Sequence, residues 1–442
     1  MRAEARVDGL EQEASALAQR PNIHCVDQFI DAAPVRDLVA SEDIRDDKGR
    51  VLWTQGQPVT AEIRERLLAR RLAQPLESTL AFRDGLTALE LADAARALLA
   101  ECEPLARLIG RNAQQVLALF GRVRFAGAPG TMLCTLSVND RPAMRYALAT
   151  GMAAAALAAM QGKAENIMLD ALQAGLMRDL GELYLDPTLK GDTRKLSFEQ
   201  WRSTCVHPIV SAALLRDAGV YADQAILAIR EHHERLDGTG FPGGLIEHRI
   251  SPLGRLLLTA DVLAGILISE GHAALRAQLA LRLIPGQFPR DAMALASERL
   301  RVDMRQVRIE VDLPKIERIA DDVLQGLQRA RKEAALLESL SSLSDSERRL
   351  AARLRLQSVQ FEMALHDSGA MTALGHQRSA LAGDREIVSE LYLVVREMSW
   401  RLPGLRRHVE LSVREHARDP AYWSGLLNAL RIDIDPAAVD AA

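Results

Sequence analysis

Two adjacent histidines, His232 and His233, end an apolar run with helical spacing, and a glycine-punctuated turn follows them. Histidine is the commonest metal ligand in proteins. Neighbouring helical residues point about 100° apart, so two such imidazoles reach one ion only where the backbone is irregular, as at a helix end. Glycines in the following turn let backbone approach an ion or a phosphate closely. The segment therefore predicts either a metal site or a helix C-terminus whose histidines favour the macrodipole.

The whole segment reads HHERLDGTGFP and closely resembles the HHExxDGxGYP signature of HD-GYP proteins, with Phe241 in place of the tyrosine. Other family landmarks follow in the expected order: a GLLHDIGK-like helix at 175–182, an HP histidine at His207, and a closing helix at 255–261. The resemblance covers residues 130–285. It implies an all-helical HD domain that hydrolyses the bacterial second messenger cyclic di-GMP with the help of metal ions.

The resemblance also implies which residues form the site. The metal ligands it assigns are Asp179, His207, His232, His233 and Asp261. Three imidazoles with a carboxylate suit a divalent Fe, Mn, Zn or Ni ion, and the sequence does not choose among these metals. The substrate contacts it assigns are Arg178, Arg235, Asp237, Gly238, Gly240, Phe241 and Pro242. No residue is assigned as a catalytic acid or base.

Three departures from the family pattern predict that a second metal ion is lost. Arg178 replaces the histidine of the HD dyad, and a guanidinium has no lone pair for a metal and repels cations. No histidine occurs between residues 25 and 206, where the family supplies one on an upstream helix. Glu182 replaces a lysine that contacts phosphate. We expect Arg178 and Glu182, four residues apart on one helix, to pair with each other.

These departures favour a degenerate HD-GYP signalling protein with lost or impaired hydrolysis, acting as a regulatory or interaction module. The alternative is an active cyclic di-GMP phosphodiesterase that uses one metal ion together with Arg178, because arginine can hold a phosphate bidentately. A different phosphohydrolase or a purely structural helical domain is a third interpretation. The expected partners are cyclic di-GMP or a related nucleotide, proteins that bind the N- and C-terminal domains, and a second copy in a homodimer.

Composition limits the other classes. A chain of 442 residues exceeds one core, and 48% apolar with 26% charged residues is typical of a folded globular protein. The net charge of −4 gives no general attraction to nucleic acid or acidic membranes. The four cysteines form no CxxC pair, and neither a signal peptide nor an apolar run of about 18 residues is present. A cytoplasmic location is expected.

The predicted fold class is mainly α, with an all-helical HD-type central domain, a small N-terminal β-containing module and a C-terminal helical domain. The expected segments are a polar lead (1–35), a β/α module (36–85), a helical connector (86–129), the HD-GYP-like domain (130–285) and a helical accessory domain (286–442). A turn at 46–49 separates two strand-like runs, 38–40 and 51–53, and Thr60 is expected to cap a helix. Expected helices include 166–184, 221–234 and 385–400, the last ended by Pro403.

Overall fold

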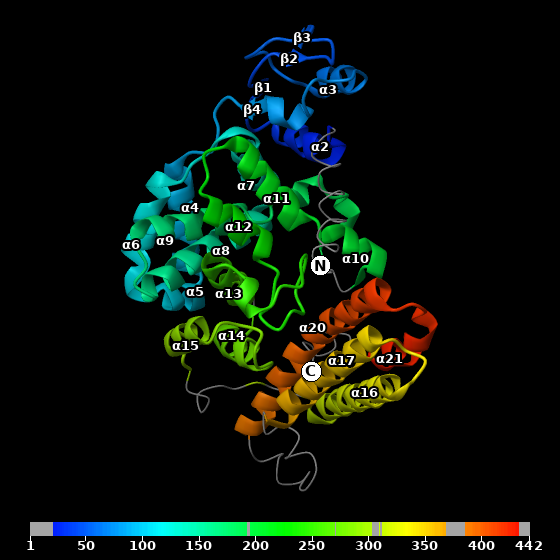
Figure 1. The fold of residues 1–442 in the computed structure, drawn as a ribbon. Helices are drawn as coiled ribbons and strands as arrows, with labels where there is room; N and C mark the ends of the chain where they lie inside the picture. Colours follow the sequence, from blue (N-terminus) through cyan, green and yellow to red (C-terminus); the bar gives the residue numbers. More distant parts are fainter. Residues whose placement is uncertain are drawn as a thin grey trace. The chain divides into compact units, whose positions relative to one another are not determined.

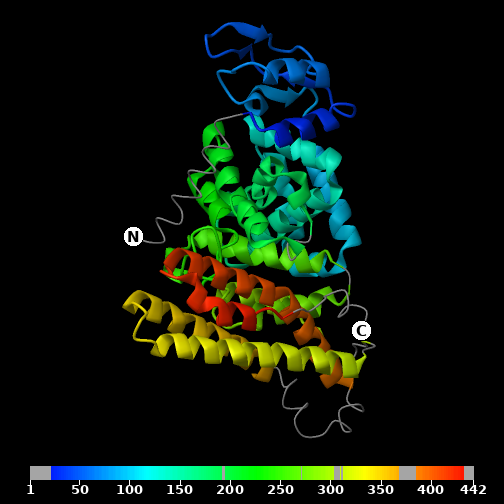
Figure 2. The ribbon, with the colours of Figure 1, turned by 90° about the vertical axis from the view of Figure 1, so that its right-hand side faces the viewer.

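The computed structural model describes residues 21–191, 195–269, 271–302, 309, 312–367 and 385–432. Two compact units divide the chain: Met1–Ala273 with Phe288–Leu300, and Ala274–Gln287 with Arg301–Ala442. Helices dominate each unit, and short strands occur in the described part only between residues 38 and 82 (Figures 1 and 2). The predicted fold class is confirmed. Most of the predicted polar lead, residues 1–20, lies outside the described residues.

The first unit begins with a small α/β module. Its elements are α2 (Ile23–Ala32), β1 (Leu38–Ala40), β2 (Ile44–Arg45), β3 (Val51–Trp53), α3 (Ala61–Leu68), η1 (Leu76–Thr79) and β4 (Leu80–Phe82). Thr60 caps α3 as predicted, accepting a hydrogen bond from the Ile63 amide. The runs 38–40 and 51–53 do not pair with each other as a hairpin. Each has another antiparallel partner: β1 pairs with β4, and β3 pairs with β2. The helix α2 was not predicted.

A buried carboxyl group ties this module to the helices that follow. Glu77 is fully buried and accepts from the Asn22 amide at 3.1 and 3.2 Å. The Asn22 side-chain amide in turn donates to the Tyr184 carbonyl at 3.0 Å. Burial raises the pKa of Glu77 to about 7. The buried surroundings of Glu77 therefore favour the protonated form of its carboxyl group.

The rest of the first unit is helical. A connector comprises α4 (Ala88–Glu101), α5 (Glu103–Ile109), η2 (Gly110–Asn112), α6 (Ala113–Leu119) and η3 (Phe120–Arg122). The central helices are α7 (Gly127–Asn139), α8 (Arg141–Met160), α9 (Glu165–Met177), η4 (Leu180–Tyr184), η5 (Pro187–Leu189), α10 (Phe198–Thr204), α11 (His207–Ala218), α12 (Asp223–Glu231), η7 (Glu247–Arg249), α13 (Pro252–Leu267) and α15 (Arg290–Arg299).

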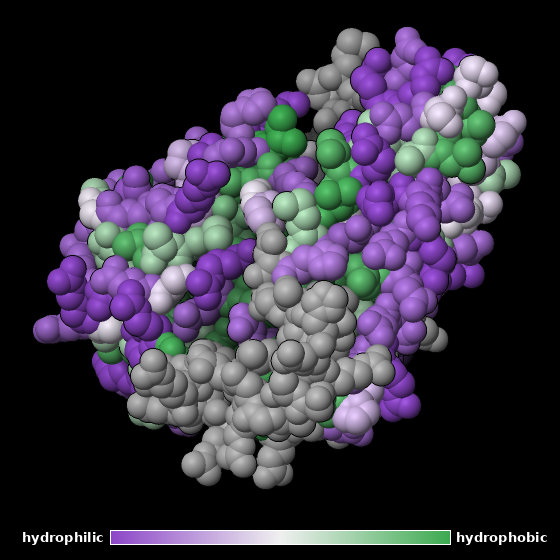
Figure 3. Space-filling view, turned by 90° about the horizontal axis from the view of Figure 1, so that it is seen from below, coloured by the Kyte–Doolittle hydropathy of each residue, from purple (hydrophilic) through white to green (hydrophobic). Residues whose placement is uncertain are grey.

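The helix α8 is the core of this part. It is the one described helix long and apolar enough to cross a membrane, yet 72% of its most apolar window is buried inside the protein. The core helix of a globular protein passes the same test. Figure 3 shows hydrophilic side chains interspersed with apolar ones on one face of the molecule. Packing inside the protein therefore accounts for the apolar character of α8.

Small residues let α8 and α9 approach closely. A Cβ atom on Gly175 would lie 2.5 Å from the Gly151 Cα atom, and one on Gly151 would lie 2.8 Å from the Leu172 carbonyl oxygen. Real side chains essentially never come so near, so any larger residue here must push the two helices apart. This contact sets the position of the C-terminal end of α9.

Two predicted helices end earlier than expected. Residues 166–184 do not form one helix, because α9 ends at Met177 and the chain continues into η4. Residues 221–234 contribute only α12, which ends at Glu231. Both differences place chemically important residues just beyond helix ends, where the irregular backbone allows neighbouring side chains to converge.

The second unit has its own core. Its elements are α14 (Ala273–Arg282), α16 (Leu313–Ser339), α17 (Asp345–Asp367), α20 (Arg385–His416), η9 (Pro420–Trp423) and α21 (Ser424–Ala429). Leu275, Leu283 and Ile284, in and just after α14, belong to the buried cluster of this unit. The predicted stop at Pro403 is wrong, since α20 runs through the proline. Buried Leu402 and Leu405 on either side hold the helix in the core.

Replacing Glu77 by Gln should change how stability depends on pH. The pKa of Glu77 in the folded protein, about 7, lies above its ordinary value of 4.5. Between these values the unfolded chain releases the proton before the folded protein does. The contribution of Glu77 to the free energy of unfolding is therefore complete below pH 4.5 and is lost as pH rises through 7. Urea unfolding should show the wild type losing about 3 kcal/mol relative to the Gln variant over this interval. Parallel pH profiles would contradict this assignment.

Substitution of Gly175 by Ala should lower the free energy of unfolding of the first unit by about 1–3 kcal/mol, because the new methyl group overlaps Gly151. The matched control is Gly121→Ala, where no atom lies within 4 Å of the added Cβ. Urea unfolding of the two variants measures the difference. Equal stability would mean that the α8–α9 contact relaxes at no cost.

Candidate metal centre

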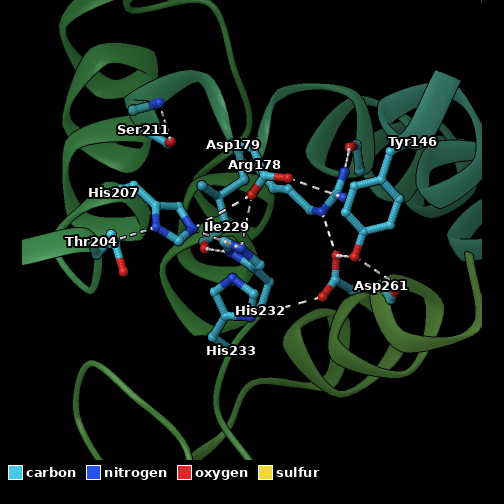
Figure 4. A network of polar contacts seen from close by, with 12 residues as sticks. Tyr146, Arg178, Asp179, Thr204, His207, Ser211, Ile229, His232, His233 and Asp261 are labelled. Atoms are coloured by element: carbon cyan, nitrogen blue, oxygen red, sulfur yellow. Dashed lines mark hydrogen bonds and ion pairs between the residues drawn. The ribbon is translucent and has the colours of Figure 1, made fainter. Parts of the chain in front are cut away.

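Four side chains with metal-ligand atoms converge from three places in the first unit. They are Asp179, between α9 and η4; His207, the first residue of α11; and His232 with His233, directly after α12. One ligand atom from each lies within 4.8 Å of the others. Figure 4 shows the three imidazoles and the carboxylate turned toward one another. The structure therefore brings four of the five predicted ligands into one cluster.

Local packing accounts for this convergence. A Cβ atom on Gly181 would lie 2.4 Å from the His207 carbonyl oxygen, so only glycine lets η4 lie against the start of α11. The Gly181 amide also donates to the Ser211 hydroxyl at 2.8 Å. On the other side, the Glu231 carboxylate accepts from the amide and hydroxyl of Ser251, at 2.9 and 2.6 Å, and so ties the end of α12 to the start of α13.

The distances in the cluster suit a single ion. The Asp179 Oδ1 atom lies 3.2 Å from His232 Nε2 and 3.5 Å from His207 Nε2, and the two Nε2 atoms are 3.4 Å apart. Ligand atoms held about 2.1 Å from one ion in tetrahedral geometry are separated by about 3.4 Å. The spacing of these three atoms therefore matches that of ligands around one cation.

The Nδ1 atoms of His207 and His232, which do not face the cluster, also support a metal site. His207 Nδ1 lies 2.7 Å from the Thr204 carbonyl, and His232 Nδ1 lies 2.6 Å from the Ile229 carbonyl. A carbonyl only accepts hydrogen bonds, so each Nδ1 carries a proton and, in the neutral ring, each Nε2 presents a lone pair. Two lone pairs that face each other at 3.4 Å repel, and either a shared proton or a bound metal cation relieves this repulsion. Backbone carbonyls that fix the tautomer in this way are typical of metal-binding histidines.

Electrostatics favour the ligand-competent forms of Asp179 and His233, whereas for His207 burial opposes the charged ring but the hydrogen bond to Asp179 and the nearby carboxylates raise the pKa. Burial opposes the charge of Asp179, yet the Arg178 guanidinium and the two histidines hold the pKa of that carboxyl well below its usual range. Burial, reinforced by His232 and His207, keeps the pKa of His233 well below its usual range. An ionised carboxylate and a neutral imidazole are the forms that bind divalent metals.

Arg178 lies beside the cluster and is fully buried. Its Nε atom donates to Asp261 Oδ1 at 2.6 Å, and its Nη2 atom lies 3.0 Å from Asp179 Oδ2. Within the described residues, none of its ion pairs goes to Glu182, so the expected Arg178–Glu182 pair is wrong. The physical reason is that α9 ends at Met177, and residues 178 and 182 are not four apart on one helix.

Tyr146 completes this arrangement. Its ring lies 4.1 Å from the Arg178 guanidinium carbon, and its hydroxyl donates to Asp261 Oδ1 at 2.8 Å. Asp261 Oδ2 is 3.8 Å from His233 Nδ1. Asp261 therefore borders the four-residue cluster, while its Oδ1 atom is already bound by Arg178 and Tyr146. The predicted metal role of Asp261 stays a prediction.

The glycine-rich segment folds back over the cluster. Gly238 has a positive φ of 80°, and a Cβ atom on Gly240 would lie 2.4 Å from the Arg235 amide nitrogen, so both positions require glycine. The Glu234 carboxylate accepts from the Gly243 and Leu245 amides, at 2.6 and 2.8 Å. The Glu234 carboxylate thus holds the glycine-rich segment in place through two backbone hydrogen bonds.

The predicted substrate residues divide into two groups. Phe241 lies over the cluster, with its ring 4.6 Å from that of His233, and Pro242 follows it through a cis peptide bond. Arg235 and Asp237 hold the loop itself: Arg235 donates to the Glu234 carbonyl at 2.7 Å, and Asp237 accepts from the Thr239 amide at 3.0 Å. Their predicted contact with substrate stays a prediction.

Three supporting residues were not predicted: Tyr146, Glu234 and Trp201, whose ring lies 6.0 Å from that of Phe241. Glu234 stands inside the HHE signature, so its position was a usable signal. Trp201 carries no local sequence mark, because its relation to the site depends on contacts between distant helices. Tyr146 lies on the upstream helix where the family supplies a histidine, but its contacts with Arg178 and Asp261 also depend on long-range packing.

Comparisons with known proteins agree with the helical site. Residues 133–284 match the HD domain family. The cyclic di-GMP phosphodiesterase PA4108 of Pseudomonas aeruginosa is 28% identical over 130 residues, which cover 29% of this chain and 31% of that protein. The 3'3'-cGAMP-specific phosphodiesterase 3 of Vibrio cholerae is 32% identical over 90 residues, 20% of this chain and 19% of that protein.

A solved structure of Bd1817, an HDG"Y"P protein from Bdellovibrio bacteriovorus, matches 60% of this chain and 96% of its own, with 14% identity and a TM-score of 0.34. The matched segments span less than a third of the curated relatives. Residues 133–284 therefore match the HD domain family, and part of the chain is similar in sequence to proteins named as cyclic dinucleotide phosphodiesterases, which is consistent with the HD-GYP family.

Proposed function

We propose that this chain is a degenerate HD-GYP signalling protein that holds one divalent metal ion, has lost or impaired cyclic di-GMP hydrolysis, and acts as a regulatory or interaction module. The observation that carries the proposal is the buried guanidinium of Arg178. It stands at the position of the family's dyad histidine and pairs with both Asp179 and Asp261.

One ion, of Fe, Mn, Zn or Ni, would be held by Asp179, His207, His232 and His233. The chemistry that a bound divalent ion supplies is polarisation of a phosphate oxygen and activation of water. Two-metal hydrolysis needs a second cation about 3.5–4 Å away, bridged by a shared carboxylate. Here the second oxygen of Asp179 lies 3.0 Å from Arg178 instead. A guanidinium neutralises the carboxylates but cannot activate a water molecule.

The same burial argues against the alternative, an active phosphodiesterase that uses one ion together with Arg178. Arg178 has no exposed surface, and its Nε and Nη1 atoms donate to Asp261 and to the Gly175 carbonyl. Its charge is thus directed at the protein and not at a substrate phosphate. Glu182, where the family has lysine, is partly buried, and burial together with Asp179 raises its pKa to about 7. Neither its acid form nor its anion attracts a phosphate.

A signalling role implies ligands and partners. We propose that the site still binds cyclic di-GMP or a related nucleotide, since the imidazole cluster and the glycine-rich loop are retained. The N-terminal module and the C-terminal helices are the proposed surfaces for protein partners or a second copy of the chain. We also propose a cytoplasmic location, because the apolar helix α8 is a core helix.

Metal analysis of protein purified without added metal should give about one divalent transition ion per chain. Substitution of His233 by Ala removes one of the four ligands and should lower that content and the affinity for added metal by about 10-fold or more. The matched control is His248→Ala, an exposed histidine in η7, which should leave the content unchanged. Two or more tightly bound ions per chain would contradict a one-ion centre.

Cyclic di-GMP hydrolysis by metal-loaded protein should be absent or far below the typical enzyme rate of about 10 per second. Combined substitution Arg178→His, Glu182→Lys and Tyr146→His should restore measurable turnover and raise the metal content. Tyr146 is the upstream position to change, because its hydroxyl already reaches Asp261. Turnover near 10 per second by the unmodified protein would refute the degenerate interpretation and make Arg178 catalytic.

A further inference from the structure

We propose that the first unit carries a separate binding site for a small molecule with an apolar body and a single carboxylate group. The site is a pocket of about 610 Å³ between α4, the end of α7 and the first turns of α8. None of the described residues that line it belongs to the histidine cluster or to the glycine-rich loop. The inference therefore goes beyond the proposed function and does not depend on it.

Apolar side chains form the floor of the pocket. Leu91 and Leu98 come from α4, and Met144 and Leu148 come from α8. The members of each pair are seven or four residues apart, so they lie on one face of their helix. All four are buried, with exposed fractions of at most 7%. The pocket volume lies within the range of about 300–1,000 Å³ that is usual for small-molecule sites. The two helix faces thus offer an apolar body a continuous surface.

Small residues leave this pocket open. Ala94 and Ala97 line it from the same face of α4, and both are exposed. A methyl side chain fills little of the space between two helices, whereas protein interiors are otherwise closely packed. The space that larger side chains would occupy at these two positions is therefore accessible from solvent.

Four of the five charged side chains that line the pocket already pair with each other. Arg36 lies 2.5 Å from Glu90, and Arg145 lies 2.8 Å from Glu101. Glu90 also accepts a hydrogen bond from the Thr87 amide at 2.8 Å. The negative charges of both glutamates are thus compensated by groups of the protein.

Arg141, the first residue of α8, is the fifth charged residue of the lining, and it is exposed. Within the part of the chain that the structure describes, its guanidinium has no hydrogen-bond or ion-pair partner. The adjacent Asp140 carboxylate accepts from the Ala143 amide at 3.0 Å and caps the helix. Three arginines and two glutamates leave the lining with one uncompensated positive charge.

The apolar floor and the single free charge together define the ligand class. A guanidinium holds a carboxylate through two parallel hydrogen bonds. One carboxylate matches the free charge of Arg141, while a cation would meet three arginines. The apolar body then lies over the floor between the two helices. Such a ligand contacts α8, the helix whose Tyr146 also faces the buried guanidinium of Arg178.

Calorimetric titration of the full-length protein with octanoate, and with octan-1-ol as its uncharged analogue, tests the proposal. We expect octanoate to bind at one site per chain and octanol to bind about 5-fold or more weakly, because it lacks the charged hydrogen-bond acceptor. Arg141→Gln should lower the octanoate affinity by about 5-fold or more and leave the octanol affinity unchanged. The matched control is Arg111→Gln, an exposed arginine of the same unit outside the pocket, which should change neither affinity.

A second pair of variants tests the location. Ala94→Phe places a ring inside the pocket and should abolish the binding of both octanoate and octanol. Ala100→Phe adds the same ring at an exposed position of α4 that does not line the pocket, and it should leave both affinities unchanged.

Three outcomes would overturn the proposal: no octanoate binding by the wild type, equal octanoate affinity of the wild type and Arg141→Gln, or octanoate binding retained in Ala94→Phe. The substituted residues lie outside the metal centre, so each variant should keep the metal content of the wild type. Failure of the pocket would therefore leave the proposed function standing, and failure of the metal analysis would leave the pocket standing.

Discussion

A guanidinium buried among helices is costly, because each charge taken out of water must regain its solvation from protein groups. Arg178 regains it from Asp261 on α13, from Asp179 after α9, from the Gly175 carbonyl and from the face of the Tyr146 ring on α8. The contacts of this one guanidinium thereby link α8, the end of α9 and α13, which enclose the site. Removing a single partner of such a network typically costs about 3–5 kcal/mol, since an uncompensated charge is left behind. The arginine is thus part of the fold as well as part of the site.

The metal centre depends on this arrangement indirectly. Asp179 turns one oxygen to the histidines and the other to Arg178, so the position of its carboxylate is set from both sides. The loop above the cluster is positioned separately, by the Glu234 carboxylate and by two glycines that no larger residue can replace. The four side chains of the proposed metal site are therefore held by groups outside the ligand set, as is usual for metal sites in proteins.

The site was largely predictable from the sequence because its key residues lie in short, specific motifs. The histidine pair, His207 and Asp179 were expected to converge, and they do so just beyond helix ends. Arg178 shows where such reasoning stops. Its local spacing pointed to Glu182, but its partner is Asp261, 83 residues away, and no periodic pattern encodes a contact at that distance. The pairing of β1 with β4 and the passage of α20 through Pro403 were missed for the same reason: long-range packing overrode the local signal.

The chain passes between its two units more than once. The HD domain match reaches residue 284, yet residues 274–287 pack in the core of the second unit, and residues 288–300 return to the first. The buried pair of Arg276 and Glu397, 3.4 Å apart, belongs to that second core. A gene fusion or recombination event with a single breakpoint could not exchange the C-terminal unit cleanly, because one of its helices is encoded upstream of α15. Any single cut between residues 273 and 301 would therefore leave one of the two units without part of its structure.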